Sequence, residues 1–420
     1  MSAPLVVMKF GGSSVAGAER IKRVARRIAR ERAAGSNLVV VVSAMGDTTD
    51  ELLALAAAIT DDPDTRELDV LLATGEQQSS TLVSMALHAL SVPAISLTGP
   101  QAGITTDGTY GKARIAGVDP ARIHQEIAAG KVVIVAGFQG QSAKAIDMSE
   151  ITTLGRGGSD TTAVALAAAL KADRCQIFTD VKGIYTADPR IATDAQQLPV
   201  IGYEEMMELA HQGAQVMQVR AVELGWVNDV VIEVLSSFED APGTLIKEDP
   251  LVEQRNKVRG LAHDRNVAKI TLVGVPDKPG VAQGVFGPLA EAGVVVDMIV
   301  QNVGHGGATD ISFTIPRVEL AKAKRILEPL IREMGFDDMT TDSSVAKVSI
   351  VGAGIQNAPG YAARMFGTLA SEGINIEMIS TSEIRITTII AEDRVEQAVR
   401  ALHAAFALEQ PEAVEAAPAG

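Results

Sequence analysis

The chain has 420 residues, which at the usual domain size predicts about two to four domains. Its net charge of −15 and its 3% of aromatic residues argue against nucleic acid as the main partner, because clustered Lys and Arg hold phosphate backbones and aromatic platforms hold bases. The single cysteine, Cys175, excludes an intrachain disulfide and a cysteine-built metal site. No apolar run has the length of a membrane span and no signal-peptide pattern is present, so we expect a cytoplasmic protein without a membrane partner.

The first 240 residues alternate short runs rich in Val and Ile with helical stretches. The runs are apolar at nearly every position, as expected for parallel strands buried on both faces. They are Leu5–Phe10, Leu38–Ser43, Ala94–Leu97, Val132–Ala136, Cys175–Thr179 and Val230–Leu235. Strands alternating with helices predict an α/β three-layer sandwich with a mainly parallel sheet, which binds ligands at the carboxyl ends of its strands.

Two of the predicted helices carry clear patterns. The first has Ile21, Val24, Ala25 and Ile28 on one face, so it covers the sheet with that face. The second, residues 161–171, is apolar on nearly all sides, so we expect it to be buried.

The pattern breaks after residue 236, and an internal repeat follows it. Asp277-Lys-Pro-Gly280 is echoed by Asn357-Ala-Pro-Gly360 at an offset of 80 residues. Each copy reads strand, turn, helix, strand, strand, helix, and a unit this short buries little core alone, so we expect the copies to pair. The sequence therefore predicts a first domain at 1–245, a linker at 246–266, two α+β modules at 267–342 and 343–408, and a frayed tail at 409–420.

A first candidate site is Lys9-Phe-Gly-Gly-Ser-Ser14, between the first strand and the first helix. Gly11 and Gly12 let the backbone approach a ligand, while Lys9 and the helix N-terminus favour negative charge, which suits a phosphate. The spacing matches neither of the common phosphate-binding glycine motifs, so the alternative is a tight turn with a solvated lysine.

A second candidate is the stretch from Gly155 to Thr162, which opens the buried helix. Ser159 or Asp160 can cap that helix, and the alternative is simply a capped glycine turn. A cap does not require an arginine among three glycines, however, and Arg156 can clamp a carboxylate with two parallel hydrogen bonds.

A third candidate is Thr179–Arg190, which follows a buried strand. It can hold a nucleotide, with Tyr185 against the base and Arg190 near the phosphates, or it is an ordinary polar loop. Ser43 and Glu76 also lie where ligands are expected, whereas the six histidines are scattered without metal-ligand spacing, so no metal ligand is predicted.

Together these motifs resemble those of the aspartokinases, the amino-acid kinases that phosphorylate aspartate. The matching stretches are KFGGSSV at 9–15, VVSAMG at 41–46, GE at 75–76, TTLGRGGSDTTA at 152–163 and TDVKGIYTADPR at 179–190. The repeat resembles a tandem of ACT domains, down to DKPG at 277–280 and STSEIRI at 380–386. The resemblance implies an amino-acid kinase fold followed by two ferredoxin-like ACT modules.

The resemblance also implies roles for individual residues. The catalytic residues would be Lys9, Arg156 and Asp160. The nucleotide would be held by Lys9, Gly11, Gly12, Ser13, Thr179, Asp180, Tyr185, Arg190 and Gln215. Aspartate would be surrounded by Ser43, Thr49, Glu76, Arg156, Gly158 and Ser159, with Arg156 on a carboxylate and Glu76 facing the ammonium. Gln215 is a departure, because the family commonly has a lysine there, and its absence removes a cation near the nucleotide.

The implied reaction transfers the γ-phosphoryl of ATP to the β-carboxylate of L-aspartate, with Mg²⁺ held mainly by the phosphates. The product feeds lysine, threonine and methionine synthesis, which implies feedback inhibition by lysine and/or threonine. Two alternatives remain: another amino-acid kinase of the same fold, or a catalytically weak amino-acid sensor.

We expect the effector where the Pro-Gly turn of one module faces the following strand of its partner. Such a turn presents free backbone N–H groups at a helix start, which suits a carboxylate. The residues concerned are Asp277, Gly280, Val281, Ala282, Gln301, Asn302, Asn357, Pro359, Gly360, Asn375, Ile376 and Thr381. We also expect a homo-oligomer, a dimer or tetramer, assembled through these modules.

Overall fold

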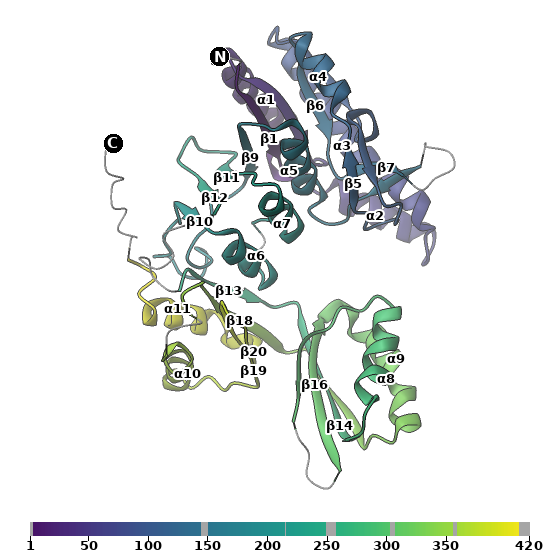
Figure 1. Cartoon of the computed structure of the whole chain (residues 1–420), viewed down its shortest axis with the longest axis vertical. Coiled ribbons are helices and arrows are strands. Elements are labelled where there is room, and N and C mark those ends of the chain that lie inside the picture. Colours follow the sequence, from purple (N-terminus) through teal and green to yellow (C-terminus); the bar gives the residue numbers. More distant parts are fainter. Residues whose placement is uncertain are drawn as a thin grey trace. The chain divides into compact units, whose positions relative to one another are not determined.

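The computed structural model describes residues 3–143, 150–214, 216–248, 258–302, 307–355 and 359–410. The chain forms two compact units, of which Figure 1 shows the elements. The first unit comprises residues 1–184, 197–210 and 215–250, and the second comprises residues 185–196, 211–214 and 251–420.

An eight-stranded sheet forms the centre of the first unit, in the order β3-β6-β2-β1-β9-β11-β12-β10. The first six of these are mutually parallel, and they occupy the six apolar runs that the sequence predicts. The bounds are β1 (Leu5–Phe10), β2 (Asn37–Val42), β3 (Ala94–Leu97), β6 (Val132–Ala136), β9 (Arg174–Thr179), β11 (Ile232–Ser236), β12 (Thr244–Ile246) and β10 (Val200–Ile201). The predicted mainly parallel sheet is thus confirmed.

Helices cover both faces of this sheet. On one face α1 buries the four predicted residues Ile21, Val24, Ala25 and Ile28 in a core shared with β1, β2 and α3. On the other face α5, which is buried along almost its whole length, packs against β1, β2 and β9. The helices are α1 (Ala18–Ala33), α2 (Thr48–Ile59), α3 (Thr65–Ala89), α4 (Ala121–Ala128), α5 (Gly158–Leu170), α6 (Tyr203–His211) and α7 (Val219–Val227).

A second, four-stranded sheet in this unit is absent from the sequence-based prediction. Its order is β5-β4-β7-β8, with bounds β4 (Ile104–Thr106), β5 (Ile115–Val118), β7 (Gln139–Ser142) and β8 (Ile151–Thr153). The fully buried Asp69 of α3 holds this sheet in place, because its carboxylate accepts hydrogen bonds from Gly111 N and from both Thr153 N and Thr153 Oγ1.

The second unit contains two α+β modules. The first module has the sheet order β15-β16-β14-β17 and two helices, and its core includes Ile270, Phe313 and Leu327. Its elements are β14 (Val267–Pro276), α8 (Val281–Glu291), β15 (Asp297–Gln301), β16 (Ala308–Pro316), α9 (Leu320–Met334) and β17 (Asp338–Asp342).

The second module borrows a strand from the chain ahead of the first. Its sheet has the order β13-β18-β20-β19, and β13 (Gly260–Asp264) pairs antiparallel with β18. The other elements are β18 (Val345–Val351), α10 (Tyr361–Ser371), β19 (Met378–Thr381), β20 (Arg385–Ala391) and α11 (Val395–Ala405). Residues 260–264 are therefore a strand and not part of a linker, because β13 covers the edge of β18 that would otherwise be unpaired.

The two modules contact each other through equivalent residues. Lys269 forms an ion pair with Glu377, and Lys347 Nζ lies 2.9 Å from Asp297 Oδ2. The two lysines occupy the same place in the repeat, and so do the two carboxylates. The crossed ion pairs, above a shared apolar cluster that includes Met298 and Met378, relate the copies by an approximate two-fold axis, so the predicted pairing occurs within one chain.

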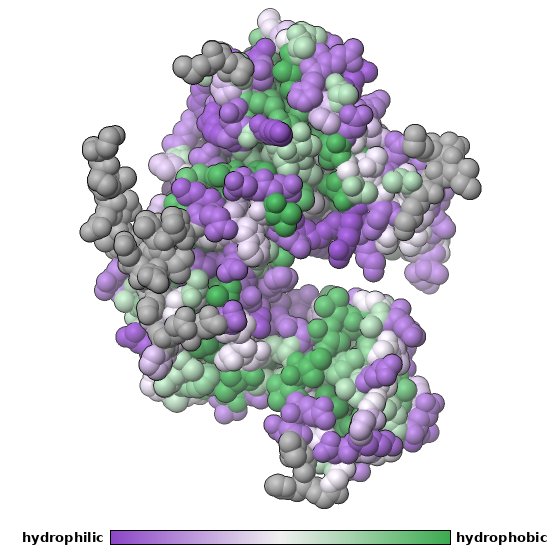
Figure 2. All heavy atoms as spheres, viewed as in Figure 1, coloured by the Kyte–Doolittle hydropathy of each residue, from purple (hydrophilic) through white to green (hydrophobic). Residues whose placement is uncertain are grey.

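On the side drawn in Figure 2, hydrophilic residues alternate with groups of apolar residues. Within the described part of the chain, no helix combines the length and apolarity needed to cross a bilayer.

Candidate active site

Lys9 and Asp160 form a buried ion pair at the carboxyl end of the sheet. Lys9 lies near the end of β1, and its Nζ is 2.6 Å from Asp160 Oδ1 in the first turn of α5. Both side chains are about one-tenth exposed. Because removing two charges from water is costly, a buried pair of this kind needs good geometry and further polar partners to offset that cost.

The turn after Lys9 can be formed only with glycine at position 12. A Cβ atom there would lie 2.9 Å from the carbonyl oxygen of Ala44, closer than real contacts allow. Gly46 N donates a hydrogen bond of 3.0 Å to Gly12 O, and Ser43 N donates one of 3.1 Å to Phe10 O. The stretches 9–15 and 41–46 therefore lie side by side. Within the first of them, Gly11 is half-buried and Ser13 is exposed.

The glycine-rich loop leads directly into α5. Gly157 has a left-handed φ of +70°, and a Cβ atom there would overlap the side chain of Gln218. Gly157 is also the N-cap of α5, and it provides no side-chain cap. The expectation that Ser159 or Asp160 caps this helix is therefore wrong: both lie inside the helix, and Asp160 pairs with Lys9 instead.

Arg220 positions the start of this loop, and sequence reasoning missed it. Its guanidinium donates hydrogen bonds of 2.7 Å to Leu154 O and 2.8 Å to Ala113 O. An arginine on an unremarkable helix such as α7 gives no signal in the sequence, because its partners are backbone carbonyls more than 60 residues away.

The predicted substrate residues lie around the same end of the sheet. Arg156 is exposed and makes no ion pair with any residue that the structure describes, so its guanidinium is available to a carboxylate. Ser159 is buried, and a Cβ atom on Gly137 would lie 2.8 Å from its Oγ. Gly158 is buried, and Thr49 is half-buried on α2.

Glu76 of α3 has half of its carboxylate unpaired. Its Oε1 accepts a 3.1 Å hydrogen bond from Ala44 N, whereas its Oε2 has no partner among the described residues. The side chain is 3% exposed, and this burial raises the pKa of the Glu76 carboxyl to about 7. An ammonium group placed at Oε2 would satisfy that oxygen and favour the ionised form.

The structure divides the predicted nucleotide residues between the two units. Thr179 and Asp180 belong to the first unit, where Thr179 Oγ1 donates a 3.2 Å hydrogen bond to Asp180 Oδ1. The half-buried Tyr185 and the exposed Arg190 belong to the second. Arg190 is held by Asp188 at 2.8 Å, and Gln215 lies outside the described residues.

The predicted effector residues lie at equivalent places in the two modules. Gly280 and Gly360 are left-handed N-caps of α8 and α10, with φ of +94° and +104°, and neither helix has a side-chain cap. Exposed residues near them and on the edge strands β15 and β19 are Asp277, Ala282, Gln301, Asn302, Pro359, Asn375 and Thr381. Val281 is instead buried in the first module's core, and Ile376 packs against that of the second, so only their backbones can face a ligand. Asn357 lies outside the described residues.

Metal ligands and the single cysteine are two further potential sources of chemistry. Within the described ranges, no three His, Cys, Asp or Glu side chains are grouped so that they could hold a metal ion. Burial in β9 raises the pKa of the Cys175 thiol to about 12, so this cysteine is a core residue and not a nucleophile.

Family models match both parts of the chain. The amino acid kinase family model matches residues 4–230, and the ACT domain model matches residues 270–329 and 348–406. The first match covers the sheet and helices that carry Lys9, Glu76 and Asp160.

Similar proteins cover nearly the whole chain. An aspartate kinase of Stutzerimonas stutzeri is 51% identical over 97% of this chain and 98% of its own length. An aspartokinase of Mycobacterium tuberculosis is 49% identical over 96% of both chains. Aspartokinase III of E. coli, solved with aspartate and ADP, is 27% identical with a TM-score of 0.79, covering 96% of this chain and 99% of its own. These matches and the geometry of the site agree, and the chain belongs to the aspartate kinases of the amino acid kinase family.

Proposed function

We propose that the chain transfers the γ-phosphoryl of ATP to the β-carboxylate of L-aspartate, giving 4-phospho-L-aspartate for lysine, threonine and methionine synthesis. The observation that carries this proposal is the buried Lys9–Asp160 pair beside the Gly12 turn and the start of α5. These groups present positive charge and backbone N–H groups where a phosphate can be held. The complex of E. coli aspartokinase III with aspartate and ADP supports the same substrate pair.

The reaction needs no general base. A carboxyl group with an ordinary pKa of about 4 is already ionised at neutral pH, so the β-carboxylate can attack directly. The difficulty is to bring two anions together, and catalysis consists of positioning and charge neutralisation. Lys9 and the backbone N–H groups near Gly11 and Gly12 neutralise the phosphates. Mg²⁺ travels with ATP, held mainly by the phosphates and water, and supplies further neutralisation when bound.

Aspartate is recognised at both of its charged ends. Arg156 clamps a carboxylate of aspartate. Glu76 Oε2, which has no partner among the described residues, accepts a hydrogen bond from the ammonium group of aspartate. Ser43, Thr49, Gly158 and Ser159 complete the pocket. Acyl phosphates react with hydroxylamine, so the test is hydroxamate formation from ATP with aspartate, glutamate or N-acetylglutamate. Turnover only with glutamate or N-acetylglutamate would indicate a different amino-acid kinase.

The ACT modules regulate this reaction by binding lysine and/or threonine. The effector's carboxylate sits on the uncapped helix starts at Gly280 and Gly360, and its ammonium is met by side chains such as Asp277. E. coli aspartokinase III has been solved with lysine and aspartate, which supports lysine as one effector. The exposed edge strands β15 and β19 offer unpaired backbone groups, through which the modules assemble a homo-oligomer.

Inhibition by the effectors has a direct test. Substituting Asp277, Gln301 or Thr381 relieves inhibition by lysine or threonine, added singly and together, and leaves uninhibited turnover unchanged. A loss of thermal stability with unchanged sensitivity would mean that these residues only support the modules.

A further inference from the structure

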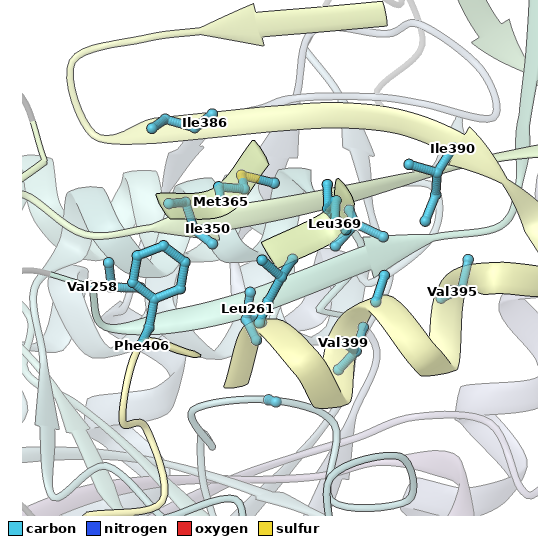
Figure 3. Close-up of a cluster of buried hydrophobic side chains, with 14 of the residues drawn as sticks. Val258, Leu261, Ile350, Met365, Leu369, Ile386, Ile390, Val395, Val399 and Phe406 are labelled. Atoms are coloured by element: carbon cyan, nitrogen blue, oxygen red, sulfur yellow. The ribbon is translucent and has the colours of Figure 1, made fainter. Parts of the chain in front are cut away.

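The segment Tyr185–Gln196, which contains two predicted nucleotide residues, is built into the second unit. Main-chain hydrogen bonds attach it at Thr186, whose N–H donates to Gln196 O at 2.9 Å and whose carbonyl accepts from Leu261 N of β13 at 2.8 Å. Ala187 and Ala192 are buried in the core of the second module, together with residues such as Leu261 and Phe406 that Figure 3 labels. The segment is thus part of a folded core and not a free loop.

The side chain of Thr186 makes the most specific of these contacts. Its buried hydroxyl lies 3.0 Å from His403 Nε2 on α11 and 3.2 Å from Leu408 O, and it accepts a 3.0 Å hydrogen bond from Gln196 N. His403 is 1% exposed, and its Nδ1 lies 3.5 Å from Asp194 Oδ1. Both tautomers of His403 satisfy the hydroxyl: a proton on Nε2 is donated to Thr186 Oγ1 while the hydroxyl donates to Leu408 O, and a proton on Nδ1 faces Asp194 while the hydroxyl donates to Nε2.

This arrangement resembles the carboxylate–histidine–hydroxyl groups of hydrolases, but it has no room for a substrate. The hydroxyl is buried and is surrounded by Gln196 N and Leu408 O, so nothing can approach it. Its effect is instead mechanical: it fixes the two ends of the segment, Thr186 and Gln196, to each other and to α11.

The segment carries Tyr185 and Arg190, the two residues of this unit that we propose to bind ATP. Tyr185 immediately precedes Thr186, and Arg190 lies four residues beyond it. Between them Asp188 accepts hydrogen bonds from the Arg190 backbone at 2.9 Å and from its guanidinium at 2.8 Å. A displacement of Thr186 would therefore move both Tyr185 and Arg190.

We propose that Thr186 and His403 are positioning residues for ATP, which hold Tyr185 and Arg190 in their nucleotide-binding conformation from within the second unit. The proposal rests on the proposed nucleotide role of Tyr185 and Arg190. A helix of the second ACT module thereby contributes to ATP affinity without contacting ATP.

The test compares Thr186→Val and His403→Gln with the unmodified full-length chain. Because small displacements of a binding group are costly, KM for ATP rises about ten-fold in both variants, while KM for aspartate stays within about two-fold. Thr186→Ser, which keeps the hydroxyl, restores the original KM for ATP. Titration calorimetry with ADP shows the same loss of affinity without depending on turnover.

Thr388→Val is the matched control. Thr388 is, like Thr186, a buried threonine of the second unit, and its hydroxyl donates a 3.3 Å hydrogen bond to Val348 O, but it lies in β20 and not in the segment. The Thr388→Val substitution removes a similar hydrogen bond from the same unit. We therefore expect it to lower thermal stability and to leave KM for ATP unchanged. An equal rise of KM for ATP in this control would overturn the proposal.

Two more variants separate this proposal from the role on which it rests. Tyr185→Ala and Arg190→Ala raise KM for ATP if the segment binds the nucleotide. If they do so and Thr186→Val and His403→Gln do not, the positioning role is wrong and the nucleotide role stands. If none of the four changes KM for ATP, both are wrong.

Discussion

The two regions that we propose to bind ATP differ in how the chain holds them. The Lys9 end is fixed entirely within the first unit, where the ammonium is nearly buried against Asp160 and the Gly12 turn is bonded to the loop after β2. The segment Tyr185–Gln196 is fixed within the second unit, and the side chain of its Arg190 is 88% exposed. Because the two regions are held by different units, we expect substitutions in the first to affect mainly turnover and substitutions in the second to affect mainly the affinity for ATP.

Substituting Lys9 has the largest expected effect on turnover. Lys9→Ala removes a preorganised charge and lowers kcat by about 10²–10³. It also leaves Asp160 buried without a partner, which costs about 3–5 kcal/mol of unfolding free energy. The double variant Lys9→Ala/Asp160→Asn recovers much of that stability in thermal melts and none of the activity. A double variant with substantial turnover would remove Lys9 from the mechanism.

Glu76 should make KM for aspartate, and not KM for ATP, depend on pH. Its pKa of about 7 in the ligand-free protein means that it must lose a proton to meet the substrate's ammonium. We therefore expect KM for aspartate to rise as pH falls below neutrality, while KM for ATP changes little. Initial rates between pH 6 and pH 8 measure both constants, and parallel changes would contradict this role.

The same carboxyl affects stability in the opposite direction from most acidic residues. Because its folded pKa lies above the ordinary value of about 4.5, ionising it destabilises the ligand-free protein as pH rises from 4.5 to 7. Glu76→Gln should therefore raise the free energy of unfolding near pH 8 by up to about 3 kcal/mol while abolishing aspartate binding. Chemical denaturation with and without aspartate measures both effects.

Arg156→Lys sharpens the comparison within the substrate site. The variant keeps the charge and loses the planar fork, so KM for aspartate rises about ten-fold or more while KM for ATP stays close to its original value. Steady-state kinetics with each substrate varied in turn give both constants. Equal damage to both would show that Arg156 does not clamp aspartate.

Gln215→Lys has the smallest expected effect. If position 215 lies near the nucleotide as the family resemblance implies, the added cation tightens ATP binding by about 1 kcal/mol, the order of one partly exposed contact between a charge and a phosphate. Calorimetric titration with ATP measures it. No change would mean that another group, such as Lys182, already provides that charge.

The sequence predicts the large elements of this fold because their signals are local. Each parallel strand is an unbroken run of Val and Ile, and α1 shows its buried face through Ile21, Val24 and Ile28. The small sheet was missed because its strands are only three or four residues long, and Asp69 holds it through partners distant in the sequence. The glycine motifs locate the site, whereas Arg220 and the Thr186–His403 contact depend on pairings across 66 and 217 residues.

The strand that the second module borrows determines the order in which the unit can be assembled during synthesis. Gly260 leaves the ribosome about 90 residues before Val351, the residue it pairs with. The strands and helices of the first module all lie between Gly260 and Val351 in the sequence. The first module can therefore fold while β13 is still unpaired. Contacts this far apart in sequence form slowly, so a nascent chain carries an unpaired strand until β18 emerges. A chain truncated after residue 342 should have β13 sensitive to protease while the first module resists it.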